Sequence, residues 1–113
     1  MSASIALPDV TSLRASSAAA CALLKTMANP DRLLLLCQLS QGERCVSDLE
    51  NLLAIRQPTL SQQLAVLREE NLVQTRRDGK QVFYSIASAP ALAVLQVLYA
   101  QFCNAAPAPK ELA

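Results

Sequence analysis

Apolar positions recur every three or four residues over most of the chain, which is the spacing of helices that each bury one face. The first such segment runs from Thr11 or Ser12, either of which can cap a helix, to about Met27. Its apolar stripe consists of Leu13, Ala20, Leu23, Leu24 and Met27. Residues 1–10 precede this pattern, and we expect them to be flexible.

A second helix is predicted to begin directly after the first. Asn29 is a favourable N-cap, and Pro30 fits the first helical position, where its missing N–H costs nothing. From Pro30 to about Leu39 the segment is mostly leucine, so we expect most of its surface to be buried. The pair Gln41-Gly42 is predicted to end this helix.

Two further helices follow, and the second of them has two contrasting faces. The first begins at about Ser47, with an inward set of Val46, Leu49, Leu52 and Leu53. After a tight connection, Pro58 opens the other, which extends to about Asn71 with Leu60, Leu64 and Leu67 inward. Its opposite side has side chains that form hydrogen bonds: Thr59, Ser61, Gln62, Gln63 and Arg68.

The remainder of the chain predicts a hairpin and a last helix. Residues 73–77 and 81–86 are rich in β-formers and flank Asp78-Gly79-Lys80, a turn sequence. Pro90 then opens a helix whose apolar stripe is Leu92, Leu95, Leu98, Tyr99 and Phe102. Residues 104–113 contain two prolines and little to bury, so we expect a flexible tail.

The composition limits the class of protein. A chain of 113 residues is typical of one domain, and 52% hydrophobic with only 4% aromatic residues means a core of Leu, Ala and Val. The net charge of +1 favours no partner by itself. Residues 1–9 have neither a basic start nor a long apolar run, and no 18-residue apolar stretch occurs, so we expect a cytoplasmic protein with no membrane contact.

The order of elements predicts a mainly α fold with a small β-hairpin, the winged helix-turn-helix, as one domain over residues 11–103. A recognition helix needs an apolar face for anchoring and short polar side chains that reach base edges in the major groove. Residues 56–80 have five basic and three acidic side chains, a net of +2. The helix pattern alone fits an ordinary amphipathic helix about as well as a recognition helix. The hairpin alone is better explained as an ordinary solvated turn, and DNA contact becomes the better interpretation when it follows a recognition helix. The candidate DNA-binding residues are Gln57, Thr59, Ser61, Gln62, Gln63, Arg68, Arg77 and Lys80, and Arg76 is expected at phosphates beside them.

Longer strings carry a family resemblance over roughly residues 15–103. LLKTMANPDRLLLLCQLSQGERCVSDLE, RQPTLSQQLAVLREENLVQTRRDGKQVFYSI and the ending LYAQFC resemble the ArsR/SmtB family of bacterial repressors, and within it the BigR/SqrR-type sulfide-responsive regulators. The resemblance implies a homodimer paired mainly through its first and last helices. It also implies repression at a palindromic double-stranded operator, with two recognition helices about 34 Å apart and release on sensing an inducer.

The resemblance further implies a redox-sensing pair. In the sulfide-responsive relatives one cysteine closes the second helix and another closes the last, and LLLLC and QFC place these roles on Cys37 and Cys103. Reactive sulfur species would persulfidate one thiolate, and the second thiol would resolve it as a disulfide or polysulfide bridge. Without the resemblance, Cys37 would be read as core filler, because free cysteine is often buried.

Other readings of the cysteines stay open. Metal-sensing relatives often have Cys-Val-Cys where this chain has Cys45-Val46-Ser47, and the chain has no histidine, so we expect no metal site and no cofactor. Thiophilic ions such as arsenite, or a general oxidant, could still act on thiols. Cys21 fits packing or a dimer interface, whereas Cys45 beside Arg44 is a rival reactive thiol.

An enzyme is the hypothesis from another class, and the sequence argues against it. The chain has no histidine, only two glycines, no glycine-rich phosphate loop and no pair of carboxylates in an apolar setting. A domain that acts only on other proteins is a third possibility, and it predicts that changing Gln62 or Lys80 would not alter DNA binding. We therefore expect a DNA-binding repressor.

Overall fold

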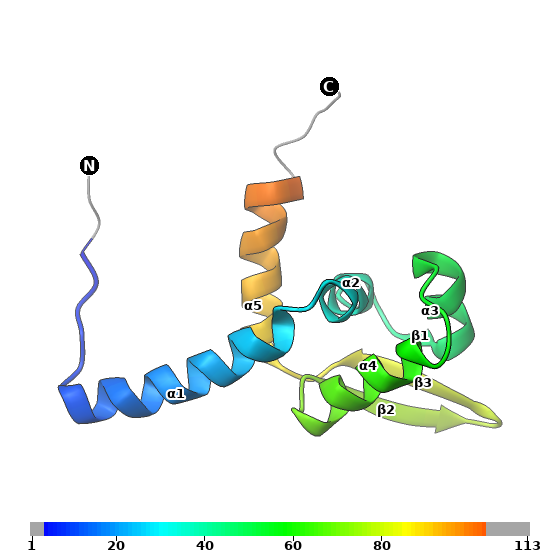
Figure 1. Cartoon of the computed structure of the whole chain (residues 1–113), viewed down its shortest axis with the longest axis horizontal. Helices are drawn as coiled ribbons and strands as arrows, with labels where there is room; N and C mark the ends of the chain where they lie inside the picture. The colour runs from blue at the N-terminus through cyan, green and yellow to red at the C-terminus, as the bar shows by residue number, and fades with distance from the viewer. Residues whose placement is uncertain (1–3, 104–113) are drawn as a thin grey trace.

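The computed structural model describes residues 4–103 as a helical body with a projecting hairpin (Figure 1). The elements in chain order are α1 (Val10–Met27), α2 (Pro30–Leu39), β1 (Arg44–Cys45), α3 (Val46–Leu53), α4 (Thr59–Glu69), β2 (Val73–Asp78), β3 (Gln81–Ile86), α5 (Ala89–Leu98) and a π-helical turn, η1 (Tyr99–Cys103). This arrangement confirms the predicted winged helix-turn-helix. The predicted tail over residues 104–113 lies outside the described residues, as does the start of the predicted flexible N-terminus.

The first helix begins earlier than the sequence pattern predicts. Asp9, and neither Thr11 nor Ser12, is its N-cap, because the Asp9 carboxylate accepts a hydrogen bond from the backbone N–H of Ser12 at 2.8 Å. That bond lowers the pKa of Asp9. From this cap α1 extends away from the body as an arm, and only its last turn reaches the core (Figure 1).

The second helix begins as predicted and lies at the centre of the fold. The Asn29 side chain accepts a hydrogen bond from the backbone N–H of Arg32 at 3.0 Å, and Pro30 occupies the first turn. α2 contacts α1, α3, α4 and β3. A helix in this position can affect both the α1 arm and the hairpin side of the molecule.

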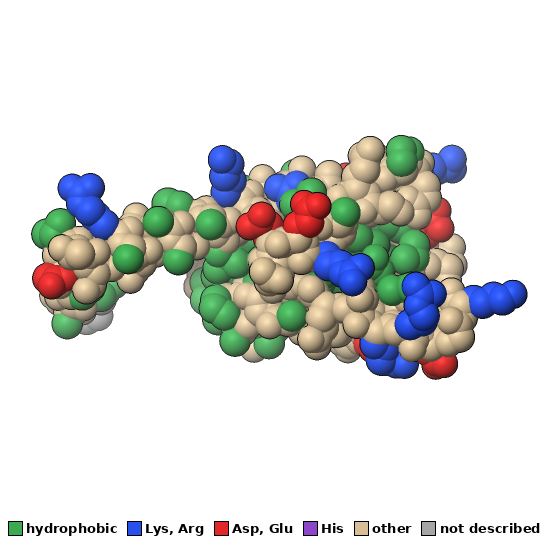
Figure 2. Space-filling view, turned by 90° about the horizontal axis from the view of Figure 1, so that it is seen from below, with side chains coloured by type: hydrophobic (Ala, Val, Ile, Leu, Met, Phe, Trp, Pro, Cys, Tyr) green, Lys and Arg blue, Asp and Glu red, His purple; other side chains and the backbone are tan. Residues whose placement is uncertain are grey.

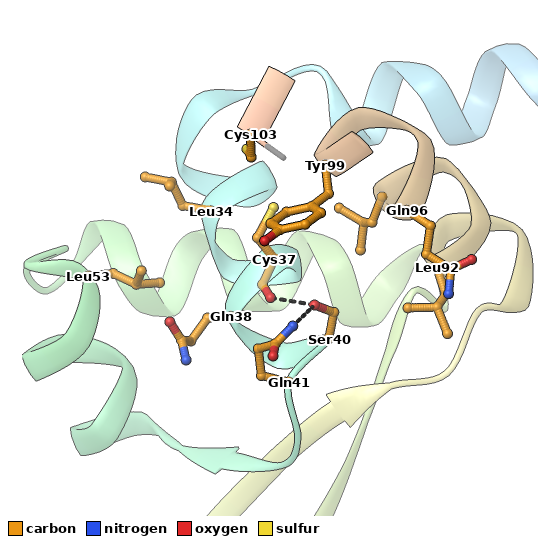
Figure 3. A pocket seen from close by; sticks show the side chains of 11 residues that line it. Leu34, Cys37, Gln38, Ser40, Gln41, Leu53, Leu92, Gln96, Tyr99 and Cys103 are labelled. Atoms are coloured by element: carbon orange, nitrogen blue, oxygen red, sulfur yellow. Dashed lines mark hydrogen bonds between the residues drawn. The ribbon is translucent and has the colours of Figure 1, made fainter. Parts of the chain in front are cut away.

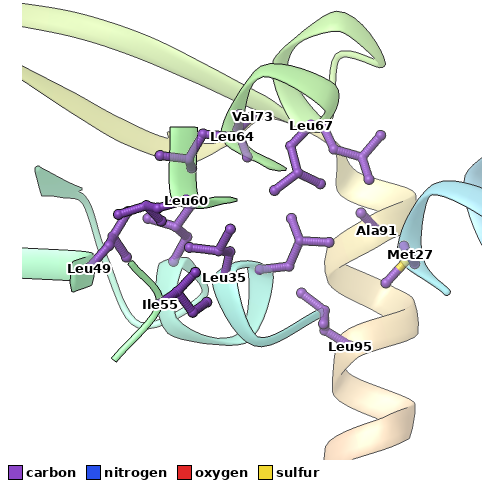
Figure 4. Packing of buried hydrophobic residues seen from close by; sticks show 13 residues of the cluster. Met27, Leu35, Leu49, Ile55, Leu60, Leu64, Leu67, Val73, Ala91 and Leu95 are labelled. Atoms are coloured by element: carbon purple, nitrogen blue, oxygen red, sulfur yellow. The ribbon is translucent and has the colours of Figure 1, made fainter. Parts of the chain in front are cut away.

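Leucines from α2, α3 and α4 form the core (Figure 4). Leu35 and Leu36 of α2 are completely buried, and so is Leu49 of α3. The inward face predicted for α4 is confirmed, since its three leucines are at most 1% exposed. The buried cluster is Met27, Leu35, Leu36, Leu39, Leu49, Ile55, Leu60, Leu64, Leu67, Leu72, Val73, Ala91 and Leu95.

Some predicted inward positions lie at the surface. Leu52 is 54% exposed, so its assignment to the inward face of α3 was wrong. In a helix of eight residues the apolar spacing does not decide which flank of the stripe meets the core. On α5 the predicted stripe reaches the core at Leu95, whereas Tyr99 and Phe102 are exposed. Ala91, outside that stripe, is buried instead.

A three-stranded antiparallel sheet supports the wing, with strand order β1-β3-β2. β2 and β3 pair from Val73↔Ile86 to Asp78↔Gln81, which leaves Gly79 and Lys80 as the two-residue turn of the predicted hairpin. Gly79 has φ +64°, a conformation that side-chain-bearing residues rarely adopt. The sequence did not predict β1, which pairs with β3 through only two residues.

Candidate functional site

The recognition helix α4 presents a polar surface to solvent. Its leucines anchor it to the core, and that anchoring turns Ser61, Gln62 and Arg68 outward, where all three are exposed. Thr59 and Gln63, also predicted to bind DNA, are only half-buried. The helix therefore has the two faces that insertion into a major groove requires.

Gln57 lies at the start of α4 and interacts with that helix. Its side-chain oxygen accepts a hydrogen bond from the backbone N–H of Ser61 at 3.1 Å. The first N–H groups of a helix have no partner within the helix, so this bond satisfies one of them. Gln57 was predicted only as a DNA contact, and the structure adds this role in shaping the helix terminus.

Arg32 connects three helices through hydrogen bonds. Its Nε donates to the carbonyl oxygen of Thr26 at 2.6 Å, and its Nη2 to that of Lys25 at 3.5 Å, both at the end of α1. Its Nη1 donates to the side-chain oxygen of Gln63 on α4 at 2.9 Å. Sequence reasoning missed Arg32, although a lone cation at the start of a leucine-rich helix was a signal that it has a specific partner.

The wing is fixed at its base by an ion pair. Arg76 donates to both carboxylate oxygens of Glu43, at 2.8 Å and 2.7 Å, and its guanidinium lies 4.8 Å from the centroid of the Phe83 ring. The hydrogen bond from Arg76 lowers the pKa of Glu43, and the same bond raises that of Arg76. Arg76 therefore holds the hairpin against the loop before β1, whereas Arg77 and Lys80 are exposed.

Basic side chains gather where the wing projects. Figure 2 looks onto the side of the molecule that carries α4 and the hairpin, and most of its Lys and Arg atoms lie toward the hairpin end. Acidic groups on this face lie near its middle and at its margins, and some of them are also at the hairpin end, where the basic groups outnumber them. Such a local positive field attracts phosphates even though the whole chain is nearly neutral.

A second site is a pocket of about 620 Å³ between α2, α3 and the end of α5, which we call the thiol pocket (Figure 3). Both cysteines of the predicted sensing pair line it, Cys37 from α2 and Cys103 from η1. The Tyr99 side chain extends from η1 over this region (Figure 3). The full lining is Leu34, Cys37, Gln38, Ser40, Gln41, Leu53, Leu92, Leu95, Gln96, Tyr99 and Cys103.

The surroundings of Cys37 in this pocket change the acidity of its thiol. Desolvation by neighbouring atoms raises the pKa of Cys37 above its ordinary value even though the residue is exposed, and the charge of a Cys103 thiolate raises it further. That second effect is the repulsion between two thiolate charges that line the same pocket. At neutral pH Cys37 is therefore held as a thiol, whereas a deprotonated thiol is the nucleophile in sulfur exchange.

The other two cysteines lie elsewhere. Cys21 is exposed on α1, and Cys45 is buried with its sulfur 3.3 Å from the Ser47 hydroxyl. Neither lines the thiol pocket. Within residues 4–103, no group of three Cys, Asp or Glu side chains is arranged to hold a metal ion. No helix in the same residues is long and apolar enough to cross a membrane.

Comparison with known proteins identifies the family. The family described as "Bacterial regulatory protein, arsR family" matches residues 29–75. The chain is 58% identical over 81 residues to the biofilm growth-associated repressor of Agrobacterium fabrum. The aligned residues make up 72% of this chain and 69% of that protein. It is 39% identical over 97 residues to the transcriptional activator HlyU of Vibrio cholerae, covering 86% and 90%.

A crystal structure extends the likeness to the whole fold. The transcriptional repressor BigR from Xylella fastidiosa superposes with a TM-score of 0.79 at 44% identity, covering 85% of this chain and 98% of that one. The resemblance inferred from the sequence is thereby confirmed at the level of the family. The chain belongs to the arsR family of bacterial regulatory proteins, and it is a DNA-binding transcriptional regulator and not an enzyme.

Proposed function

We propose that this protein is a homodimeric transcriptional repressor whose operator affinity falls when reactive sulfur species bridge Cys37 and Cys103. The observation that carries the proposal is that both thiols line one pocket, and that a charge on Cys103 raises the pKa of Cys37. Two cysteines from distant parts of the chain thus line one pocket at the junction of α2 and α5. The high identity to a protein named as a repressor supports the direction of regulation.

We assign the DNA contacts to α4 and the wing. Ser61 and Gln62 are exposed on α4 and can reach base edges, where glutamine pairs well with adenine. Positively charged side chains at the edges of this surface would contact phosphates: Arg68, Arg77 and Lys80. The amide nitrogens of Gln57 and Gln63, whose oxygens are engaged within the protein, would donate to DNA beside Thr59.

Exposed apolar side chains on α1 and at the end of α5 support the dimer. Leu24 is 52% exposed, Tyr99 61% and Phe102 76%, although all three are large apolar side chains. Large exposed apolar side chains, where they gather, mark an interface. Light scattering should give twice the mass of one chain, and Leu24→Glu should shift that mass toward the monomer. A wild-type monomer at micromolar concentration would contradict this part of the proposal.

The proposed sensing reaction balances in two steps. The Cys103 thiolate attacks the outer sulfur of a hydropersulfide RSSH, giving a Cys103 persulfide and releasing RS⁻. Cys37 loses its proton to solvent and attacks the inner sulfur, which forms the Cys37–Cys103 bond and expels HS⁻. Two thiols are oxidised, and the donor's sulfane sulfur is reduced to sulfide. The raised pKa of Cys37 favours Cys103 as the first nucleophile.

The bridge would act on DNA binding through α2. A bond between Cys37 and Cys103 ties α2 to the end of α5, and α2 also holds Gln63 of the recognition helix through Arg32. A change in the α2–α5 geometry therefore reaches the surface that meets DNA. A differential affinity of about 10⁴-fold would take the operator from nearly full to nearly empty occupancy.

Fluorescence anisotropy with the gene's own upstream DNA tests the proposal. Reduced protein should bind, and protein treated with a persulfide should be released. Cys37→Ser and Cys103→Ser should bind but fail to respond, whereas Cys21→Ser, which changes an exposed thiol outside the pocket, should respond like the wild type. Mass spectrometry should find the bridged peptide and count its sulfur atoms, which distinguishes a disulfide from a polysulfide.

The same assay separates the alternatives. Release of the Cys37→Ser/Cys103→Ser double variant by persulfide would refute the sensing pair. Release of reduced wild-type protein by arsenite or zinc, with no bridged peptide, would favour a metal(loid)-responsive regulator. Equal release by peroxide and by persulfide would favour a general oxidant sensor. Binding equally tight to unrelated DNA, with no preference for the upstream region, would contradict operator recognition.

A further inference from the structure

Among residues 4–103, none of the side chains that line the thiol pocket is charged. Leu34, Leu53, Leu92, Leu95 and Tyr99 form its apolar part, and the remaining residues besides the two cysteines are neutral Gln and Ser. Part of this polar wall is already paired, since Ser40 Oγ donates to the Cys37 carbonyl at 2.6 Å and accepts from Gln41 at 3.1 Å. A bound molecule would therefore meet leucine, an aromatic ring and neutral amides around two thiols.

From this wall we infer that the pocket selects neutral organic polysulfides with small apolar groups, of the type R–S–S–S–R, as the sulfur donors that bridge Cys37 and Cys103. The inference rests on the proposed function and names the class of molecule that triggers it. It further holds that donors carrying carboxylates, such as peptide persulfides, are disfavoured at this site. The pocket thus acts as a filter on the inducer and not only as a place where two thiols meet.

The size and chemistry of the pocket both support this class. Its volume of about 620 Å³ lies in the range of sites that enclose small molecules. Burial against leucine favours an alkyl group by about fourfold in affinity for each methylene removed from water. A carboxylate in the same place would lose its hydration and find no cation among the lining residues. Neutral and anionic donors of equal size should therefore react at different rates.

The reaction with such a donor also balances. The Cys103 thiolate attacks a terminal sulfur of R–S–S–S–R, which forms Cys103–S–S–R and releases the perthiolate RSS⁻. The R group of this adduct then lies in the pocket beside the leucines. Cys37 loses its proton to solvent and attacks the Cys103 sulfur, which forms the protein disulfide and expels RS⁻. Two protein thiols are oxidised, and one trisulfide is reduced to RSSH and RSH.

A matched pair of donors tests the inference on the full chain with Cys21→Ser, which removes the exposed thiol outside the pocket. Dipropyl trisulfide and the trisulfide of 3-mercaptopropionic acid differ only by a terminal methyl or carboxylate. The rate of Cys37–Cys103 bridging is followed by mass spectrometry and divided by the rate for N-acetylcysteine amide in solution. We expect the neutral donor to be favoured by about tenfold or more, with a rate that saturates as the donor concentration rises.

A charge placed in the wall supplies the control. Gln96 lines the pocket from the exposed side of α5, so its substitution should not disturb the core. Gln96→Lys should reduce or reverse the preference, whereas Gln96→Met should keep it. Equal normalised rates for the two donors in the wild type, or a preference unchanged by Gln96→Lys, would overturn the inference. Failure of every donor, persulfides included, to bridge the pair would overturn the proposed function instead.

Discussion

The hydrogen bond between Arg32 and Gln63 gives the sharpest quantitative prediction. Arg32 lies at the start of α2 and donates to the end of α1 as well as to the recognition helix. Arg32→Met keeps the apolar stem of the side chain and removes the guanidinium. Gln63→Leu removes the acceptor on α4 and keeps its size. Each variant removes one partner of the same hydrogen bond, so the two variants together measure the energy of that bond.

The expected magnitude follows from the kind of bond. Hydrogen bonds to charged groups contribute about 1.5–3 kcal/mol, and because this pair is partly exposed we expect a smaller coupling of about 1 kcal/mol. Arg32→Met loses two further bonds, to Thr26 and Lys25, so we expect it to cost about 2 kcal/mol of unfolding free energy. Gln63→Leu should cost about 1 kcal/mol, which corresponds to a fall in Tm of about 4–8 °C for a domain of this size.

Urea unfolding of the wild type, both single variants and the double variant gives the coupling energy. We expect the double variant to be less destabilised than the sum of the singles by about 1 kcal/mol. Gln62→Leu is the matched control, because it removes a neighbouring amide that is exposed on the same helix. Its effect should add to that of Arg32→Met without coupling. A coupling near zero for Arg32 and Gln63 would show that the bond does not persist in solution.

Three other predictions concern the core, the wing and the recognition surface. Leu64→Ala, at a side chain only 1% exposed, should cost about 2–5 kcal/mol of unfolding free energy in denaturant titrations. Glu43→Gln should loosen the hairpin and speed amide hydrogen exchange in β2. In the wild type the pKa of Glu43 is lowered from 4.5, so its pairing with Arg76 is complete above pH 4.5 and is lost as the pH falls through the lowered pKa. Acid should therefore produce the same faster exchange in β2. Lys80→Ala should weaken binding to all DNA sequences alike and reduce the salt slope by about 1, whereas Gln62→Ala should cost about 1–3 kcal/mol at particular bases only.

Local signals explain which parts of the fold could be predicted. The Asn29-Pro30 pair gave the start of α2 correctly, because capping depends on neighbouring residues alone. The hairpin turn at Gly79 followed from its backbone requirement in the same way. β1 was missed because two residues carry no periodicity, and its existence depends on pairing with β3, almost forty positions along the chain.

Interactions between residues far apart in the sequence could not be predicted for the candidate site. The partners Arg32 and Gln63 are separated by 31 positions, and Glu43 and Arg76 by 33, so no pattern in either segment could reveal that they meet. For that reason Arg76 was expected at phosphates beside Arg77. The sequence placed the two pocket cysteines by family resemblance, and the neutral wall between them became visible only in the structure.

The position of α2 makes it possible to separate sensing from DNA response. Arg32 and Cys37 belong to one ten-residue helix, so the proposed bridge, by pulling on Cys37, would also displace the donor that holds Gln63. If this link transmits the signal, Arg32→Met should leave bridge formation unchanged in mass spectrometry and yet shrink the ratio of DNA affinities between reduced and bridged protein. If the Arg32–Gln63 bond is about 1.4 kcal/mol stronger in the reduced protein than in the bridged protein, it would account for about tenfold of that ratio of DNA affinities. An unchanged ratio in Arg32→Met, with normal bridging, would mean that the signal passes through α5, at the proposed dimer interface, and bypasses the Arg32–Gln63 bond.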